Sequence, residues 1–203
     1  MNSDISVFFI ESEGFKDLSE NHSEQWNNLL NQIAVLRWGY DENKIESRIN
    51  TLKNDLLAFN SFCVFAVKNK MPLQSKSWEN INLIGFAYFC QDENDENQWY
   101  YGDLVIHPKY RKLGIFKRLV ITRHWKSGKL ISCINSQIAE RILKNNAMLE
   151  LKHRKASKLF TYIEKDNKSS ILLHEKLGFF PSENQEIING FDKNNRIVYE
   201  CIV

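Results

Sequence analysis

The middle of the chain reads Leu104-Val105-Ile106-His107-Pro108-Lys109-Tyr110-Arg111-Lys112-Leu113-Gly114-Ile115-Phe116. A β-branched strand pattern ends here, a short basic loop follows, and a helical pattern begins. The free N–H groups at a helix N-terminus face one point in space, and with the helix dipole they form an anion site. Arg111, Lys112 and Lys117 add positive charge, and Gly114 leaves room for a ligand to approach closely. The segment therefore predicts a pyrophosphate site, with a plain strand-to-helix turn and solvated basic side chains as the alternative.

A second motif lies further along the chain and reads Asn167-Lys168-Ser169-Ser170-Ile171-Leu172-Leu173-His174-Glu175-Lys176-Leu177-Gly178-Phe179. Asn167 is a good helix N-cap and Gly178 suits the position just past a helix end, so the pattern predicts a helix between them. Ser170 and His174 are four residues apart and therefore share one helix face. We expect both side chains to face a ligand, and a partly exposed histidine without a ligand is the alternative for His174.

Hydrophobic periodicity elsewhere predicts a mixed α/β protein. Short β-branched and aromatic runs predict strands, and apolar residues at spacings of three and four predict helices. The predicted strands span residues 5–10, 62–67, 81–90, 99–106, 159–163, 186–188 and 196–203. The predicted helices span residues 26–36, 45–56 and 167–177, with a further one starting at 115. Ile134, Ile138 and Ile142 predict another helix within residues 130–149. A short acidic turn at 92–97 joins two of the strands, which predicts a hairpin.

Composition narrows the class of protein. The 203 residues are 43% hydrophobic and 26% charged, which is ordinary globular usage. A formal net charge of +2 argues against a general nucleic-acid binder. The four cysteines lack the close spacing of a zinc site. The sequence shows no basic and apolar leader pattern, and no run of the roughly 20 apolar residues that a membrane span needs. We therefore expect a cytoplasmic protein with no metal and with no nucleic-acid or membrane partner.

Together, the two motifs resemble the GNAT acetyltransferase superfamily. Residues 108–115 look like its acetyl-CoA loop, usually written R/Q-x-x-G-x-G/A, and residues 167–179 look like its motif N-x-x-S/A-I-x-L-Y/H-E-K-L-G-F. The resemblance extends over residues 83–203, and the N-terminal part fits by element order. It implies a GNAT fold, a mixed α+β architecture in which helices flank a mostly antiparallel sheet with splayed strands. The span from Gly114 to Asn167 is longer than usual, which implies a single domain over residues 1–203 with a helical insertion around 127–155.

The resemblance also implies a reaction, the direct transfer of an acetyl group from acetyl-CoA to an amine. The loop would bind the pyrophosphate, and backbone groups of the preceding strand would hold the pantetheine. The residues so implied in cofactor binding are Leu104, Val105, Ile106, Arg111, Lys112, Leu113, Gly114, Ile115, Phe116, Asn167 and Ser170. Phe116 departs from the pattern, because the loop usually has Gly or Ala there.

Two side chains are implied in the chemistry. His174 stands where many relatives carry a Tyr, and it would give a proton to the leaving thiolate. A His at this position is similar to the phosphinothricin-type enzymes that acetylate small molecules. Asp103 would accept the proton of the amine, with a solvated strand aspartate as its alternative and His107 as a second candidate base.

Three functions are therefore expected, in order of preference. The first is N-acetylation of a small or amino-acid-like amine. The second is acetylation of a protein lysine or N-terminus, and the third is acyl-CoA binding without turnover. The acceptor amine and the oligomeric state are open, with a homodimer among the alternatives.

Overall fold

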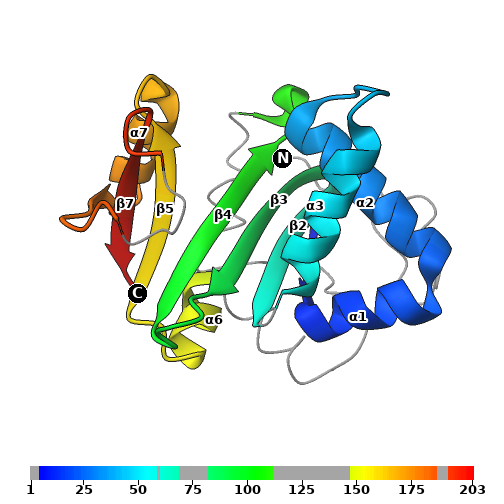
Figure 1. Cartoon of the computed structure of the whole chain (residues 1–203), viewed down its shortest axis with the longest axis horizontal. Helices are drawn as coiled ribbons and strands as arrows, with labels where there is room; N and C mark the ends of the chain where they lie inside the picture. The colour runs from blue at the N-terminus through cyan, green and yellow to red at the C-terminus, as the bar shows by residue number, and fades with distance from the viewer. Residues whose placement is uncertain (1–4, 59, 69–81, 112–146, 187–191) are drawn as a thin grey trace.

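The computed structural model describes residues 5–58, 60–68, 82–111, 147–186 and 192–203. Figure 1 shows these ranges as one twisted sheet with helices packed against it. The elements are β1 (Ile5–Glu11), α1 (Ser12–Asn21), α2 (Ser23–Trp38), α3 (Ile45–Leu57), β2 (Ser61–Lys68), β3 (Asn82–Gln91), β4 (Gln98–Ile106), η2 (Pro108–Tyr110), α6 (Ala147–His153), β5 (Lys158–Glu164), α7 (Lys168–Lys176), β6 (Phe180–Pro181) and β7 (Arg196–Ile202).

The sheet has seven strands in the order β1-β2-β3-β4-β5-β7-β6. Neighbouring strands are antiparallel throughout, except for the parallel pair β4 and β5. The expected mixed α+β class with a mostly antiparallel sheet is therefore confirmed, and so is the hairpin of β3 and β4.

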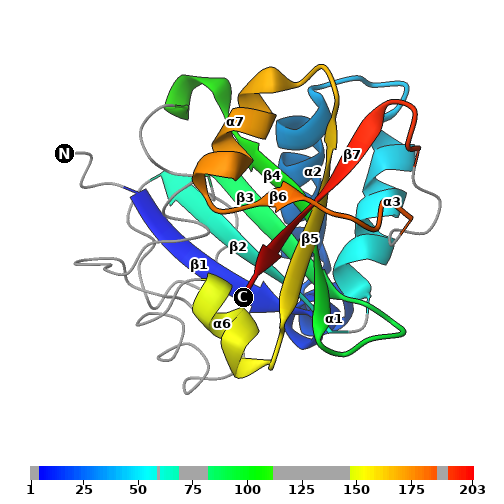
Figure 2. The same ribbon diagram turned by 90° about the vertical axis from the view of Figure 1, so that its left-hand side faces the viewer.

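Helices cover both faces of the sheet, with α1, α2 and α3 on one side and α6 and α7 on the other (Figure 2). On the first face, the Tyr88 hydroxyl of β3 donates to the main-chain carbonyl of Asp55 in α3 at 2.6 Å. On the second face, Arg154 is the residue that follows α6. Its guanidinium lies 5.3 Å from the ring centre of Phe62 and 5.5 Å from that of Trp99. Side chains of the sheet thus anchor a helical layer on each side.

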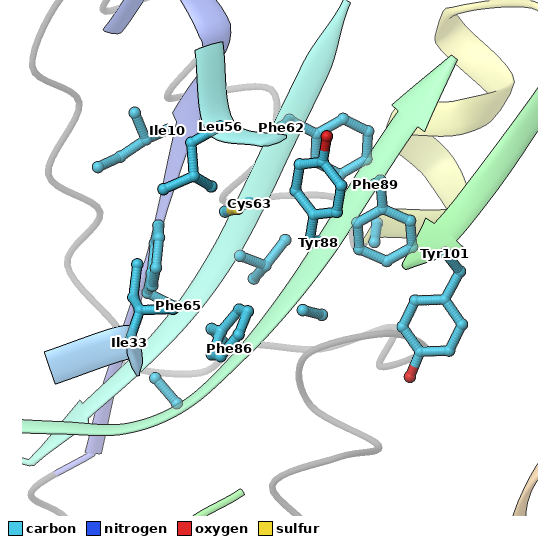
Figure 3. Packing of buried hydrophobic residues seen from close by; sticks show 14 of the residues in the cluster. Ile10, Ile33, Leu56, Phe62, Cys63, Phe65, Phe86, Tyr88, Phe89 and Tyr101 are labelled. Atoms are coloured by element: carbon cyan, nitrogen blue, oxygen red, sulfur yellow. The ribbon is translucent and has the colours of Figure 1, made fainter. Parts of the chain in front are cut away.

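Aromatic side chains bind the central strands to one another. Phe62, Phe89 and Tyr101 come from β2, β3 and β4 and follow one another across the sheet (Figure 3). The ring centres are 4.7 Å apart in the first pair and 5.3 Å apart in the second, and all three residues are buried. Such stacked pairs contribute about 0.5–1.5 kcal/mol each beyond the area they bury. They hold β4 firmly at the middle of the sheet.

A β-bulge at Gly102 reverses the facing of β4. Tyr88 pairs with Asp103 while Phe89 pairs with Tyr101, so Gly102 is an extra residue without a partner on β3. Side chains of adjacent residues in a strand point to opposite faces, and paired residues share a face. Tyr101 and Asp103 therefore face opposite sides of the sheet, although residues two apart in a regular strand face the same side.

The parallel pairing of β4 and β5 is short. It joins Gln98 to Lys158, Trp99 to Leu159 and Tyr100 to Phe160, and it stops there. Beyond Tyr100 the two strands separate, as Figure 1 shows. Among the described strands, the second half of β4 thus pairs with β3 alone.

Most predicted elements lie within a few residues of the observed ones, but two differ. The segment before the first predicted helix forms α1, whose buried Phe15 and Leu18 are too few to mark a helix in a polar stretch. The strand expected at 186–188 is wrong at its described residue, because Glu186 lies in a turn. The edge strand that pairs with β7 on the side away from β5 is Phe180–Pro181. The predicted helix around Ile134, Ile138 and Ile142 lies outside the described residues, as does most of the expected insertion. Its described part begins with α6.

Replacement of Gly102 by Ala should destabilise the fold. An added Cβ would lie 2.9 Å from Cδ1 of Tyr88, and that ring is held in place by its hydroxyl hydrogen bond to Asp55. Overpacking of this kind costs about 1–3 kcal/mol in the free energy of unfolding. Urea unfolding of Gly102→Ala in the wild-type and Tyr88→Ala backgrounds tests the cause. The cost should nearly vanish without the ring, and an equal cost in both backgrounds would contradict the clash.

Candidate active site

The second half of β4 presents backbone groups toward the side from which β5 has separated. The His107 N–H donates to the Ile84 carbonyl of β3 at 2.8 Å. Because successive residues of a strand direct their N–H and C=O groups to alternate sides, Leu104 and Ile106 direct theirs away from β3. Val105 directs its groups toward β3. Of the three strand residues expected to hold a pantetheine, Leu104 and Ile106 are the two whose backbone groups face the open edge.

The turn after β4 uses two of the predicted site residues. The Nδ1 atom of His107 accepts a hydrogen bond from the Lys109 N–H at 3.2 Å, so this nitrogen is engaged in the turn. The Arg111 Nε donates to the Ile106 carbonyl at 3.1 Å, and the side chain is exposed. The guanidinium therefore lies at the open edge of β4, and its two Nη groups carry donors that an anion could use. Lys112, Leu113, Gly114, Ile115 and Phe116 lie outside the described residues.

Helix α7 begins and ends as its sequence predicts. The Asn167 side chain caps it by accepting from the Ser170 N–H at 3.1 Å, and Gly178 follows with φ +90°. Non-glycine residues rarely adopt that backbone conformation. Asn167 is exposed, and its side-chain oxygen Oδ1 also accepts a hydrogen bond from the Ser169 hydroxyl. The interactions of its side chain in the structure are therefore those of a helix cap. Ser170 and His174 do share a face, with the Ser170 hydroxyl 3.3 Å from His174 Nδ1.

His174 is buried between α7 and β4. Its ring lies 5.7 Å from the Tyr101 ring and 5.3 Å from the Phe179 ring, measured between centroids. Its Nδ1 lies 2.7 Å from the Ser170 carbonyl, an oxygen that can only accept, so Nδ1 carries the hydrogen. Burial lowers the pKa of His174, and the hydrogen bond to the Ser170 backbone opposes that shift in part. At neutral pH the ring is neutral, with a lone pair on Nε2.

Asp103 lies on the opposite face of β4, against α2 and α3. Its Oδ2 is 2.9 Å from Nη2 of Arg37, and Nη1 of the same guanidinium is 3.6 Å from Oδ2 of Asp55. Burial raises the pKa of Asp103 to about 7, with Arg37 opposing that rise and Asp55 adding to it. A carboxyl group with such a pKa is ionised in a large fraction of molecules at neutral pH and can still take up a proton.

The structure thus gathers the predicted residues into two groups on opposite faces of β4. Asp103 belongs to the α2 and α3 face, whereas Ser170 and His174 belong to the α7 face. Arg37 and Asp55 were missed by the sequence analysis. A basic residue in the last turn of a helix is favourable on its own, so its position in α2 carries no sign of a carboxylate partner on β4.

The chain is similar to a known family of acetyltransferases. The family model "Acetyltransferase (GNAT) family" matches residues 24–122. The chain belongs to the GNAT acetyltransferase superfamily. The recognition made from the two motifs is confirmed, and as a GNAT acetyltransferase the protein is an acyltransferase. A comparison with curated protein sequences found no match.

Solved structures with TM-scores above 0.5 share the fold at low identity. An acetyltransferase from Streptococcus agalactiae is 13% identical with a TM-score of 0.54, and the alignment covers 99% of each chain. An acetyltransferase of the GNAT family from Staphylococcus aureus is 11% identical with a TM-score of 0.53, covering 97% of this chain and 99% of the other. A nourseothricin acetyltransferase is 13% identical with a TM-score of 0.42; the alignment covers 70% of this chain and spans 65% of that enzyme.

The described part of this GNAT protein contains neither a membrane-spanning helix nor a cluster of metal-ligating side chains. None of the helices there is long and apolar enough to cross a membrane. Within the same ranges, no group of three or more His, Cys, Asp or Glu side chains is arranged to hold a metal ion.

The buried His174 should make the stability of the domain depend on pH. In the unfolded chain His174 takes up a proton as the pH falls below about 6.5, whereas the folded protein resists protonation because burial lowers its pKa. Unfolding therefore binds a proton in this range, and His174 contributes a loss of stability on acidification. Urea unfolding at pH 7.5 and 5.5 should show a smaller loss in His174→Phe than in wild type. The exposed His153→Phe should behave like wild type, and equal losses in all three proteins would refute the assignment.

Proposed function

We propose that this GNAT domain transfers an acetyl group from acetyl-CoA to the amine of a small molecule, with Asp103 as the general base. The observation that carries the proposal is the juxtaposition of two features on β4. The backbone of Leu104 and Ile106 faces an edge that β5 has left open, and the carboxyl group of Asp103 stands beside them with a pKa of about 7.

The open edge suits the donor. An extended pantetheine arm can hydrogen-bond to the backbone of Leu104 and Ile106 as an added strand would. Arg111 at the end of β4 can contact a phosphate through its Nη groups, because its Nε already binds the Ile106 carbonyl. The thioester would then lie in the separation between β4 and β5, with the α7 face on one side and the Asp103 face on the other.

The Asp103 face suits the acceptor. A primary amine arrives largely as an ammonium ion and must lose a proton before its nitrogen can attack the thioester carbonyl. The Asp103 carboxylate takes that proton, directly or through one water. The C–N bond forms, the C–S bond breaks, and the electron pair leaves on the CoA sulfur. The group of Asp103, Asp55 and Arg37 carries a net negative charge when both acids are ionised, which favours a cationic acceptor.

His174 fits a different role from the proton donor that the motif implies. A neutral ring whose Nδ1 hydrogen is bound by the Ser170 carbonyl can accept at Nε2 but holds no second proton there. We therefore assign His174 to the packing and hydrogen bonding of the donor side. A CoA thiolate is a fair leaving group and can be protonated by water.

The preference for a small acceptor rests on the motif variant with His at position 174. A panel of candidate acceptor amines tests this preference. CoA release should be measured with simple amines, amino acids and polyamines on one side, and with lysine-containing and N-terminal peptides on the other. Turnover of small amines supports the proposal. Turnover of peptides alone would replace it with protein acetylation, and CoA binding without any turnover would replace it with a non-catalytic function.

Acetyl-CoA should stabilise the domain, and Arg111→Ala should weaken that effect. A ligand at a hundredfold excess over its Kd stabilises the folded state by about 2.7 kcal/mol. Loss of a charge-assisted contact to a phosphate should cost about 1.5–3 kcal/mol of binding free energy. Isothermal titration of CoA into Arg111→Ala and Lys109→Ala separates a specific contact from the general charge of the turn. Equal weakening in the two variants would rule out a specific Arg111 contact.

Removal of the Asp103 carboxylate should abolish most turnover. General base catalysis contributes about a hundredfold to ten-thousandfold in rate, so we expect Asp103→Asn to lower kcat by that range at pH 7. In wild type the ionised form is the active one, so kcat/KM should rise with pH and level off above about 7. The exposed Glu93→Gln serves as control. A wild-type rate for Asp103→Asn at saturating acetyl-CoA would end the assignment.

A further inference from the structure

Arg37 occupies an unusual place for a surface helix residue. It lies in the last turn of α2, and its side chain is only 20% exposed. The guanidinium carbon lies 4.2 Å from the centre of the Trp38 ring, and the Arg48 guanidinium lies 5.7 Å from the same centre. The two Arg37 Nη groups point to carboxylates of two different elements, Asp103 on β4 and Asp55 on α3. A planar guanidinium can stack on an indole and serve two carboxylates at once, which an ammonium cannot do in the same way.

The two carboxylates are not equivalent partners. Nη2 of Arg37 lies 2.9 Å from Oδ2 of Asp103, which makes this pair a hydrogen-bonded ion pair. Nη1 lies 3.6 Å from Oδ2 of Asp55, which is too long for a hydrogen bond. Asp55 is also the more exposed, at 41% against 19% for Asp103. Arg37 therefore acts mainly on Asp103, and Asp55 competes for the same cation.

We propose that Arg37 is a positioning residue for the transfer reaction: stacked on Trp38 and shared with Asp55, its guanidinium holds the Asp103 side chain in place as a carboxylate. The inference rests on the proposed function of Asp103 as general base. It adds a second residue, from a helix that neither sequence motif includes, to the machinery at the open edge of β4.

The electrostatic argument follows from the groups around Asp103. Among the described residues, the titratable neighbours are Arg37 of α2, Asp55 of α3, Cys63 of β2, Tyr88 of β3 and Tyr101 of β4. Burial raises the pKa values of Cys63, Tyr88 and Tyr101 far enough that all three stay neutral around pH 7. The charges that act on Asp103 are thus one cation and one anion. Without the cation, burial and Asp55 would both favour the protonated acid, which cannot accept a proton from the amine.

The test compares two changes of opposite sign. Arg37→Gln removes the cation and should raise the pKa of Asp103, whereas Asp55→Asn removes the competing anion and should lower it. The Tyr88 hydrogen bond uses the main-chain carbonyl of Asp55, so Asp55→Asn leaves it intact. Arg48→Gln is the matched control, because Arg48 also contacts the Trp38 ring and its ion pair is with Asp41. Arg37→Lys should restore part of the wild-type behaviour.

Two measurements read out each variant. The first is the pKa of the Asp103 carboxyl group in the free protein. It is followed by the carbon-13 NMR signal of the carboxyl carbon, which is assigned by the loss of that signal in Asp103→Asn. The second is the dependence of kcat/KM on pH. A neighbouring cation lowers the pKa of a carboxyl group by about one unit or more, so in Arg37→Gln both midpoints should rise by about one pH unit. At pH 7 kcat/KM should then fall about fivefold, and it should recover above pH 9.

Each outcome has one reading. Midpoints that rise in Arg37→Gln, fall in Asp55→Asn and stay in place in Arg48→Gln support the proposal. Unchanged midpoints in Arg37→Gln, or equal shifts in Arg48→Gln, overturn it. If Arg37→Gln does not fold, an unchanged NMR midpoint in Asp55→Asn overturns it as well. A shifted NMR midpoint with an unshifted pH–rate profile instead removes Asp103 as the base, and with it the positioning role in catalysis, while leaving the ion pair itself established.

Discussion

Parallel hydrogen bonds between β4 and β5 end after three residue pairs, and the candidate site depends on that interruption. A sheet that continued to pair would satisfy the backbone of both strands internally and leave no polar edge inside the domain. Here β4 is held by its full antiparallel pairing with β3, and β5 by its full pairing with β7. Each strand therefore keeps its geometry after the separation, and the N–H and C=O groups that Leu104 and Ile106 direct away from β3 are positioned by rigid elements rather than by loops.

The bulge at Gly102 makes the two sides of this edge chemically different. Without the extra residue, Tyr101 and Asp103 would share a face, and the carboxyl group would lie among the aromatic rings near His174. With it, Asp103 reaches the charged ends of α2 and α3, while Tyr101 packs against His174 and Phe179. Burial favours the neutral form of both ionisable groups. It therefore raises the pKa of Asp103, an acid, and lowers the pKa of His174, a base. The Arg37 guanidinium acts as a counter-ion that favours the charged form of Asp103.

The buried position of Asp103 affects both the stability of the fold and the strength of this group as a base. A carboxylate kept in a mostly buried position lowers the stability of the fold unless it is paired, and Arg37 supplies the pair at 2.9 Å. The same pairing brings the pKa of the acid down toward neutrality, where a base is most effective. The domain thereby holds an ionised group at the edge of its sheet without exposing it fully to water, which would return its pKa to the ordinary range.

Local residue preferences were sufficient to predict the features whose causes are local. The helix cap of Asn167 and the turn at Gly178 follow from side-chain and backbone preferences within a few residues, and the strand that contains Leu104 to Ile106 follows from its β-branched run. The residues of two motifs, in their order along the chain, were enough to recognise the GNAT family. Tertiary structure alone decided which face of β4 carries Asp103, because a bulge is a property of two strands in register and not of one. It also decided that Arg37 meets Asp103, since the packing of α2 on the sheet brings together residues that are far apart in the chain and share no sequence pattern.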